Sequence, residues 1–311
     1  MRRRSALALL VPLLVTGLTA CGSGSGSSAR KAAGDLPTAA GDYGSKPTFT
    51  FPGPPPATLK KEVLREGKGP VVASGDLLVA DYLGQVWQGA VFDNSYDRKS
   101  PAGFVIGTGK VIPGWDQVLV GVKAGSRVLM SIPPAQGYGS SGNEQAGIKG
   151  TDTLVFVVDV IGSYGKTATG DPKAAVQAAQ TAGVTVTGAP GAAPQLAVAK
   201  AAAQPKAPAL TLLAKGSGAP VGVGLLVVQY VATKYTGEPA GSTYDDGAPA
   251  AVPVSAGEGG TPFDLLKGVP LGSRVLLRLP GRPAAQGSPA QPAIAVVADL
   301  VAEPKTAAET G

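Results

Sequence analysis

Hydrophobic and β-branched residues recur along the chain in short runs bounded by Gly, Pro or Asn. Runs of this length and composition are typical of antiparallel β-strands. In the first half they predict strands in the segments EVLREGKG (62–69), LLVADYLGQV (77–86), FVIG (104–107), RVLMSIPP (127–134) and TLVFVVDVI (153–161). The pattern favours a mainly β architecture.

One segment, PGWDQVLVGV, departs from this pattern. Its apolar residues fall at helical spacing, at Trp115, Val118, Leu119 and Val122. Pro113 stands where the first turn of a helix tolerates proline. We therefore expect one short helix packed on a curved antiparallel sheet, which is an α+β fold. On periodicity alone, Trp115 is most simply a core residue of that helix.

The pattern also repeats along the chain. Residues 111–128 read VIPGWDQVLVGVKAGSRV, and residues 259–275 read GGTPFDLLKGVPLGSRV. Two further segments recur at a similar distance along the chain. LLVADY (77–82) recurs as LLVVQY (225–230), and LVFVVDV (154–160) recurs as IAVVADL (294–300). A repeat of this length implies two copies of one domain, separated by an Ala-rich stretch.

These patterns divide the chain into successive segments. We predict a signal peptide (1–20), a flexible tether (21–40), a first domain (41–165), an Ala-rich linker (166–187), a second domain (188–303) and a tail (304–311).

The first residues have the features of an export signal. MRRR supplies positive charge, and SALALLVPLLVTGLTA is too short and too interrupted to span a bilayer comfortably. The following residue is Cys21, and the sequence LTAC resembles the lipobox of bacterial lipoproteins, in which the thiol is acylated. We expect a lipid anchor on the extracytoplasmic face of the cell membrane. The alternative is an ordinary secretory peptide with an incidental cysteine.

Composition narrows the chemistry. The 311 residues are 44% hydrophobic and 15% charged, which is compatible with packed cores. The chain has no histidine, which excludes Ser-His and Cys-His catalysis and His-ligated metals. The formal charge of +6 falls to about +3 when MRRR is removed, too little to argue for nucleic-acid binding.

Several motifs, in order, resemble an FKBP-type peptidyl-prolyl cis-trans isomerase domain over roughly residues 57–162. They are VADYLGQVWQGAVFDNSYDR, FVIGTGKVIPGWDQVLVGVKAGSRVLMSIPPAQGYG and TLVFVVDVI. The resemblance implies two FKBP-like domains of α+β class, each with one short α-helix. It implies no cofactor and no metal. The expected partners are exported proteins with X-Pro bonds and, in addition, macrolide ligands.

The reaction itself needs neither nucleophile nor metal. Rotation about an X-Pro bond crosses a barrier of about 20 kcal/mol, because amide resonance is lost in the twisted state. The twisted amide is less dipolar than the planar one, so an apolar pocket that excludes water favours the transition state.

The resemblance also implies site residues. Trp115 would form the floor under the proline ring, with walls from Tyr82, Phe92, Val111, Ile112 and Phe156. The hydroxyl of Tyr138 and the backbone N–H of Ile112 would meet the substrate, and Asp93 would orient the twisting amide at the pocket edge. In isolation, Phe92-Asp93 is also a strand end before a turn, and Tyr138 a loop residue.

This sequence departs from the family pattern in two places. Ala102 stands after Pro101 where another aromatic is common, and the loop GSSGNEQAGIKG lacks a histidine often found there. Both departures bear on ligand affinity and residue preference rather than on activity.

The second copy departs further from the family pattern than the first. The alignment pairs Trp115 with Phe263, and it further pairs Phe156 with Val296, Tyr138 with Ser288, and Phe92-Asp93 with Tyr244-Asp245. We expect a degenerate domain that keeps the fold without the pocket. The alternatives for the whole chain are a tethered, non-catalytic chaperone for Pro-containing segments and a structural lipoprotein.

Overall fold

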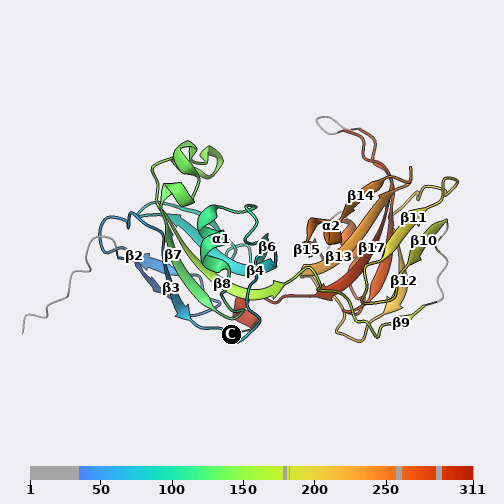
Figure 1. Cartoon of the computed structure of the whole chain (residues 1–311), viewed down its shortest axis with the longest axis horizontal. Helices are drawn as coiled ribbons and strands as arrows, with labels where there is room; N and C mark the ends of the chain where they lie inside the picture. The colour runs from blue at the N-terminus through green and yellow to red at the C-terminus, as the bar shows by residue number, and fades with distance from the viewer. Residues whose placement is uncertain (1–34, 178–180, 182, 257–260, 285–288, 311) are drawn as a thin grey trace, which may run out of the picture. The chain divides into compact units, whose positions relative to one another are not determined.

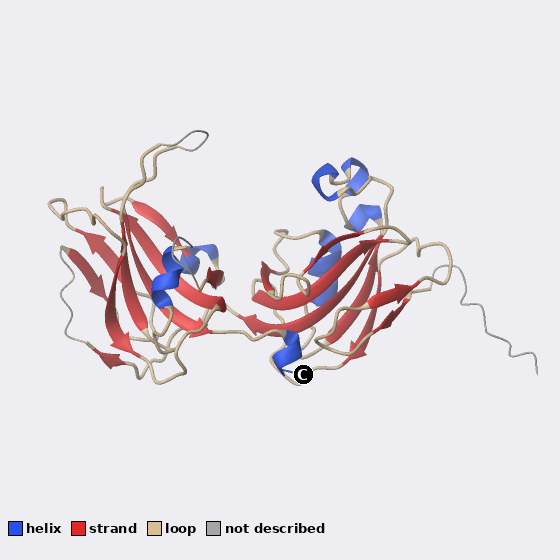
Figure 2. Cartoon of the chain, turned by 180° about the vertical axis from the view of Figure 1, so that it is seen from behind, coloured by secondary structure: helices blue, strands red, loops and turns tan. Residues whose placement is uncertain are grey.

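The computed structural model describes residues 35–177, 181, 183–256, 261–284 and 289–310. Strands dominate these residues, and the helices are short (Figure 2). The predicted signal peptide, Cys21 and most of the predicted tether lie outside the described residues.

The first half of the chain forms a six-stranded antiparallel sheet, called the first sheet below (Figure 1). The strand order is β3-β7-β8-β4-β5, and β6 also pairs with β4. The central strands β4 and β8 are almost wholly buried, which explains their nearly continuous apolar sequences. The predicted strands are confirmed, and the structure adds β5. The bounds are β3 (Lys60–Arg65), β4 (Leu77–Val86), β5 (Val91–Asn94), β6 (Ala102–Val105), β7 (Arg127–Ile132) and β8 (Leu154–Tyr164).

Helix α1 (Pro113–Leu119) packs across one face of this sheet (Figure 1). Proline occupies its first turn, where no intrahelical N–H is needed. Asp116 in the same turn accepts hydrogen bonds from the N–H groups of Gly107 and Gly109, at 2.6 and 2.7 Å. These bonds tie the helix to the loop before it. The predicted helix is confirmed, with Trp115 buried against the sheet.

A hairpin of β1 (Thr38–Ala40) and β2 (Thr48–Thr50) covers the other face of the first sheet. Phe49 and Phe51 pack there beside Trp87, whose indole N–H donates to the Gly53 carbonyl at 2.9 Å. This hairpin begins three residues inside the predicted tether, since the apolar face of the sheet needs a cover. Between β7 and β8 the chain makes the short 3-10 helices η1 (Pro134–Gln136), η2 (Gly139–Ser141) and η3 (Glu144–Ala146).

The second half forms a seven-stranded antiparallel sheet, called the second sheet. Its order is β14-β13-β17-β16-β12-β9, and β15 also pairs with β13. In the reverse direction, β12-β16-β17-β13-β14 corresponds strand by strand to β3-β7-β8-β4-β5 of the first sheet, and β9 is an added edge strand. The bounds are β9 (Ala175–Val176), β12 (Ala209–Lys215), β13 (Gly224–Lys234), β14 (Pro239–Ser242), β15 (Ala250–Val254), β16 (Arg274–Leu279) and β17 (Ile294–Ala302).

A second hairpin, β10 (Val184–Thr187) with β11 (Gln195–Val198), precedes the second sheet as β1–β2 precedes the first. The predicted linker 166–187 is therefore partly strand, because it supplies the whole of β9 and of β10.

The expectation of one α-helix against each sheet is wrong in detail for the second half. The segment matching α1 is the 3-10 helix η4 (Pro262–Leu266), which ends before Lys267. Its sequence is shorter than the first copy's, and a segment of this length favours 3-10 geometry. The α-helices of this half are α2 (Thr243–Asp246) and α3 (Ala307–Thr310), both elsewhere along the chain.

Within the described ranges, no helix has the length and apolar character needed to cross a bilayer. Over the same residues, no group of three or more acidic or cysteine side chains is placed to hold a metal ion.

Candidate functional site: an aromatic pocket on the first sheet

A cavity of about 540 Å³ opens between α1 and the first sheet. Six of its lining residues are aromatic in a chain with only 5% aromatic residues. The lining comprises Tyr82, Phe92, Asp93, Phe104, Lys110, Val111, Ile112, Pro113, Trp115, Gly137, Tyr138 and Phe156. The pocket thus gathers aromatic side chains from separate segments of the first half.

The strand register brings the walls together. Gly84 on β4 stands opposite Phe156 on one neighbouring strand and Asp93 on the other. A Cβ at Gly84 would lie 2.6 Å from atoms of both the Phe92 and Phe156 rings. Glycine is therefore required here so that the two rings can close over the strand.

Trp115 forms the base of the pocket. Its ring is 4% exposed and makes edge contacts with Tyr82, Phe104 and Phe156, with centroid separations of 5.7, 4.9 and 5.3 Å. Phe92 meets Phe156 edge-on at 5.5 Å. Edge-to-face packing of this kind holds each ring in one orientation. The result is a rigid apolar cage of suitable size for a small ring.

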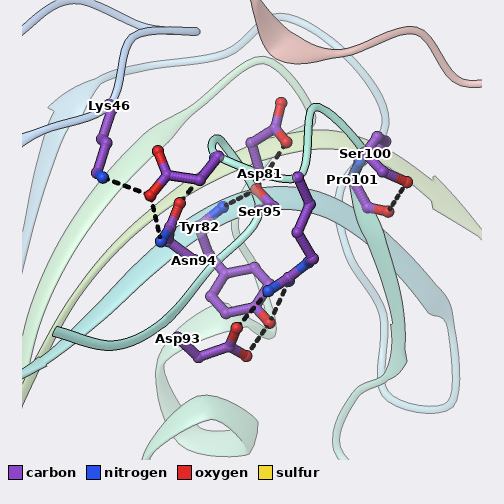
Figure 3. Close-up of polar contacts among 10 residues, drawn as sticks. Lys46, Asp81, Tyr82, Asp93, Asn94, Ser95, Ser100 and Pro101 are labelled. Atoms are coloured by element: carbon purple, nitrogen blue, oxygen red, sulfur yellow. Dashed lines mark hydrogen bonds and ion pairs between the residues drawn. The ribbon is translucent and has the colours of Figure 1, made fainter.

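A polar triad borders the cage. The Tyr82 hydroxyl donates to Asp93, the Arg98 guanidinium also donates to Asp93, and Arg98 Nη2 lies 3.0 Å from the Tyr82 oxygen. Figure 3 shows Tyr82 and Asp93 within this group. The triad fixes the carboxylate at the pocket edge.

The triad also sets ionisation. Burial, followed by the hydrogen bond to Asp93, raises the pKa of Tyr82 to about 12, so this hydroxyl stays protonated. Burial alone would raise the pKa of Asp93, but hydrogen bonds from Tyr82 and Arg98 outweigh it and lower that pKa below its ordinary value. Asp93 is therefore a carboxylate at neutral pH, and Arg98 balances its charge.

The structure brings all of the predicted pocket residues of the first copy into this one lining. Tyr138 lies at the rim, 37% exposed, and Ile112 is the N-cap residue directly before α1. The individual catalytic roles expected for Asp93, Tyr138 and Ile112 stay predictions.

Sequence reasoning missed Phe104, Lys110, Pro113, Gly137 and the supporting Arg98. Phe104 could have been found, because it lies two residues from Ala102 on the same strand and so on the same face. Lys110 and Arg98 gave no such signal, since charged residues in loops are usually solvated.

One predicted pairing between the copies is wrong. In the first sheet, Asp93 stands opposite Gly84. Ala232 of the second sheet matches Gly84, and Gly241 stands opposite it. The residue that matches Asp93 is therefore Gly241 and not Asp245. Tyr244 instead matches Tyr96, since each hydroxyl donates to the buried aspartate of its own half, at 3.1 and 2.9 Å. The wrong pairing arose because both segments have an aromatic residue followed by Asp. Ser288, the predicted partner of Tyr138, lies outside the described residues.

Comparison with known proteins agrees with the pocket. Residues 69–161 match the family described as FKBP-type peptidyl-prolyl cis-trans isomerase. The chain is 40% identical over 118 residues to an FK506-binding protein of Streptomyces anulatus, covering 37% of this chain and 95% of that one. The chain belongs to this isomerase family.

Other relatives are similar over the same region. FK506-binding protein 1A of Aspergillus fumigatus is 37% identical, over 35% of this chain and 98% of its own length. The crystal structure of AtFKBP13 is 37% identical, covering 34% of this chain and 94% of that one, with a TM-score of 0.32. The isomerase family's reaction is rotation about X-Pro bonds, and the aromatic pocket lies within the matched residues.

Proposed function

We propose that this chain is a lipid-anchored prolyl isomerase that assists the folding of exported proteins. The aromatic cage over Trp115 carries the proposal, because it offers a pocket lined by aromatic side chains for a proline ring. Slow prolyl isomerisation limits folding of many chains, so an anchored enzyme would act where exported chains fold.

The mechanism follows from the cage and its edge. A proline ring seated on Trp115 places its amide among Tyr82, Phe92 and Phe156, where water is excluded. Loss of amide resonance lowers the dipole of the twisted bond, so this surrounding favours the transition state over the planar forms. The Asp93 carboxylate at the edge, ionised and held by Arg98, orients the twisting amide electrostatically. A million-fold acceleration would need about 8 kcal/mol of such stabilisation.

The second half is proposed to be a degenerate FKBP-like domain. Its strand order repeats that of the first sheet, apart from an added edge strand. At the pocket positions it has Gly241 in place of Asp93, Val296 in place of Phe156 and Phe263 in place of Trp115. A non-catalytic role in holding client chains is the second candidate for this half, favoured by the loss of aromatic walls.

A kinetic measurement tests the isomerase. NMR exchange spectroscopy on a prolyl peptide should show accelerated cis-trans exchange with the wild-type chain and strongly reduced acceleration with Phe156→Ala. A wild-type chain that binds the peptide without accelerating exchange would favour the holding role instead.

Ligand binding offers a second readout. The macrolide FK506, for which relatives are named, should occupy the cage and change the fluorescence of Trp115. A Trp87→Phe variant isolates that signal, because Trp87 packs under the hairpin on the opposite face. No change in emission together with no heat of binding would count against the pocket.

The anchor is tested at Cys21. Replacing Cys21 with Ser should abolish acylation and membrane retention while leaving isomerase activity intact. Unacylated wild-type protein in the soluble fraction would show that the ordinary secretory alternative is correct.

A further inference from the structure

The segments that follow the last strand of each sheet carry information that the pocket does not explain. After β8 ends at Tyr164, residues 166–171 run along the second sheet. Gln229 donates to the Lys166 carbonyl at 3.0 Å, the Thr169 hydroxyl lies 3.3 Å from Asp299 Oδ2, and the Asp171 N–H donates to the Gly272 carbonyl at 2.9 Å. The second half thus receives a segment that extends from the first sheet.

The reverse contact is also present. After β17 ends at Ala302, the chain reaches the first sheet, where the Ala307 N–H donates to Asp81 Oδ2 at 2.8 Å. Ala307 is fully buried, and a Cβ placed on Gly44 would lie 2.6 Å from the Ala308 backbone. The first half thus receives a segment that extends from the second sheet.

The receiving positions correspond in the two halves. Asp81 stands opposite the buried Asp159 across paired strands, and Gln229 stands opposite the buried Asp299 in the same way. Beside each is a glycine of the preceding hairpin turn at positive φ, Gly44 at 85° and Gly191 at 82°.

Each of these glycines is covered by the incoming segment. A Cβ at Gly191 would lie 2.6 Å from the Pro172 side chain, as one at Gly44 would clash with Ala308. Glycine at both positions permits this close approach. The two grooves are therefore equivalent places filled by equivalent segments.

An apolar contact accompanies the exchange. Leu77 and Val79 of β4 cluster with Leu225 and Val227 of β13, which occupy matching places in the two sheets. An interface in which the same patch of each half meets the other is isologous, the arrangement of a two-fold dimer.

We propose that residues 303–309 are a strap that docks in the groove formed by Asp81 and Gly44 of the first half, called the Asp81 groove. In exchange, residues 166–172 dock in the groove formed by Gln229 and Gly191 of the second half, called the Gln229 groove. The partner of each groove is thus a segment of this same chain, and the exchange joins the halves as an internal two-fold pair. The proposal is independent of the isomerase function.

The two grooves bind opposite backbone groups of their straps. The Asp81 carboxylate can only accept, so it selects a backbone N–H, whereas the Gln229 amide donates to a carbonyl. Asp81 also accepts from the Ser95 hydroxyl at 2.7 Å, which holds the carboxylate in place (Figure 3). A negative charge introduced at position 307 would meet Asp81 at close range.

Two matched variants of the full chain test the strap. Ala307→Asp places a carboxylate against Asp81, and Ala308→Asp places the same charge on the exposed neighbouring position. Both substitutions suit the first turn of a helix, so helix propensity does not separate them. Hydrogen exchange measured by mass spectrometry over residues 303–310 should become about tenfold faster in Ala307→Asp, and change less than about twofold in Ala308→Asp.

A trans experiment gives an independent reading. A chain ending at Ala302 should bind a fluorescent synthetic peptide of residues 303–310, and the same peptide carrying Ala307→Asp should not bind. If the shortened chain fails to fold, the exchange comparison decides alone. Equal exchange rates in the two variants, or equal binding of the two peptides, would overturn the proposal.

Discussion

The two halves of the molecule share their buried polar chemistry and differ in their pockets. Arg127 pairs with Asp159 at 3.1 Å in the first half, and Arg274 pairs with Asp299 at 2.6 and 2.8 Å in the second. All four side chains are buried. The aromatic set of the pocket, by contrast, is complete in the first half only. Among its described residues, the second half keeps Tyr230 and Phe263 at matching positions but has Val296 where the first half has Phe156.

The shared ion pair has a structural task. Arg127 donates to the Ser45 carbonyl at 2.9 Å, and Arg274 donates to the Gly188 carbonyl at 2.9 Å, each in the turn of the preceding hairpin. One guanidinium thus joins sheet and hairpin in each half. The comparison teaches that the groups which hold the fold persist in both halves, whereas the full aromatic pocket is present in one.

The largest effect should come from breaking this shared pair. Arg127→Met and Arg274→Met should each lower the free energy of unfolding of their own half by about 3–5 kcal/mol, because a buried carboxylate loses its partner. Chemical denaturation followed by fluorescence and circular dichroism measures this. In Arg127→Met, a further Asp159→Leu change should restore part of the stability. A large loss of unfolding free energy in one half and none in the other would show that the two buried ion pairs are not equivalent.

The next effect separates the pockets. Trp115→Leu should reduce kcat/KM for a prolyl peptide about 100-fold, or ~2.7 kcal/mol, because the floor of the cage is lost. Phe263→Leu, at the matching position of the second half, should leave kcat/KM unchanged. Unfolding curves of both variants control for stability. Substantial activity remaining in Trp115→Leu would indicate a second active site.

Much of the first half could be predicted from the sequence. Its strands and helix follow from local apolar periodicity, and its cage residues from several motifs in fixed order. Phe104 shares a strand face with Ala102, which was a usable signal, but placing that face in the pocket wall requires the pairing of β6 with β4, which periodicity does not specify. Arg98 was missed because its role depends on a loop that returns to Asp93.

The second half was predicted less well for a related reason. Its repeat was visible, but the pairing of Asp93 with Asp245 relied on similar letters rather than on strand register. The hydrogen bonds of Tyr96 and Tyr244 to the buried aspartates fix that register, and they join residues far apart in sequence. The exchanged straps gave no sequence signal, because a single backbone N–H makes the decisive contact.

A smaller effect is expected at the pocket edge. Asp93→Ala should lower kcat/KM about tenfold, or ~1.4 kcal/mol, by removing the oriented carboxylate while leaving the cage intact. Asp97→Ala is the matched control, since Asp97 is an exposed carboxylate on the same loop, paired with Lys46. Its loss should not change kcat/KM. If both variants behave alike, Asp93 has no special role in catalysis.

The smallest effect concerns the pH dependence of the buried aspartate in the first half. Burial raises the pKa of Asp159 to about 6, although Arg127, the Gly44 N–H and Tyr96 oppose this, and the carboxylate of Asp81 across the strand adds to it. The folded state then holds a proton that the unfolded state has released. The resulting stability is fully present below the unfolded pKa of about 4 and is lost as the pH rises through about 6.

The second half suggests the variant that tests this, because it has Gln229 where the first has Asp81. In Asp81→Asn the like charge is gone, so the pKa of Asp159 should fall. Between pH 7 and pH 4 the wild type should gain unfolding free energy from this group, on the order of 1 kcal/mol. This gain should be smaller in Asp81→Asn, because the pKa of Asp159 is lower there. Carboxyl-carbon NMR titration of Asp159 measures the first quantity, and denaturation at several pH values the second. A wild-type midpoint near 4, or a midpoint that Asp81→Asn does not lower, would contradict this account of Asp159.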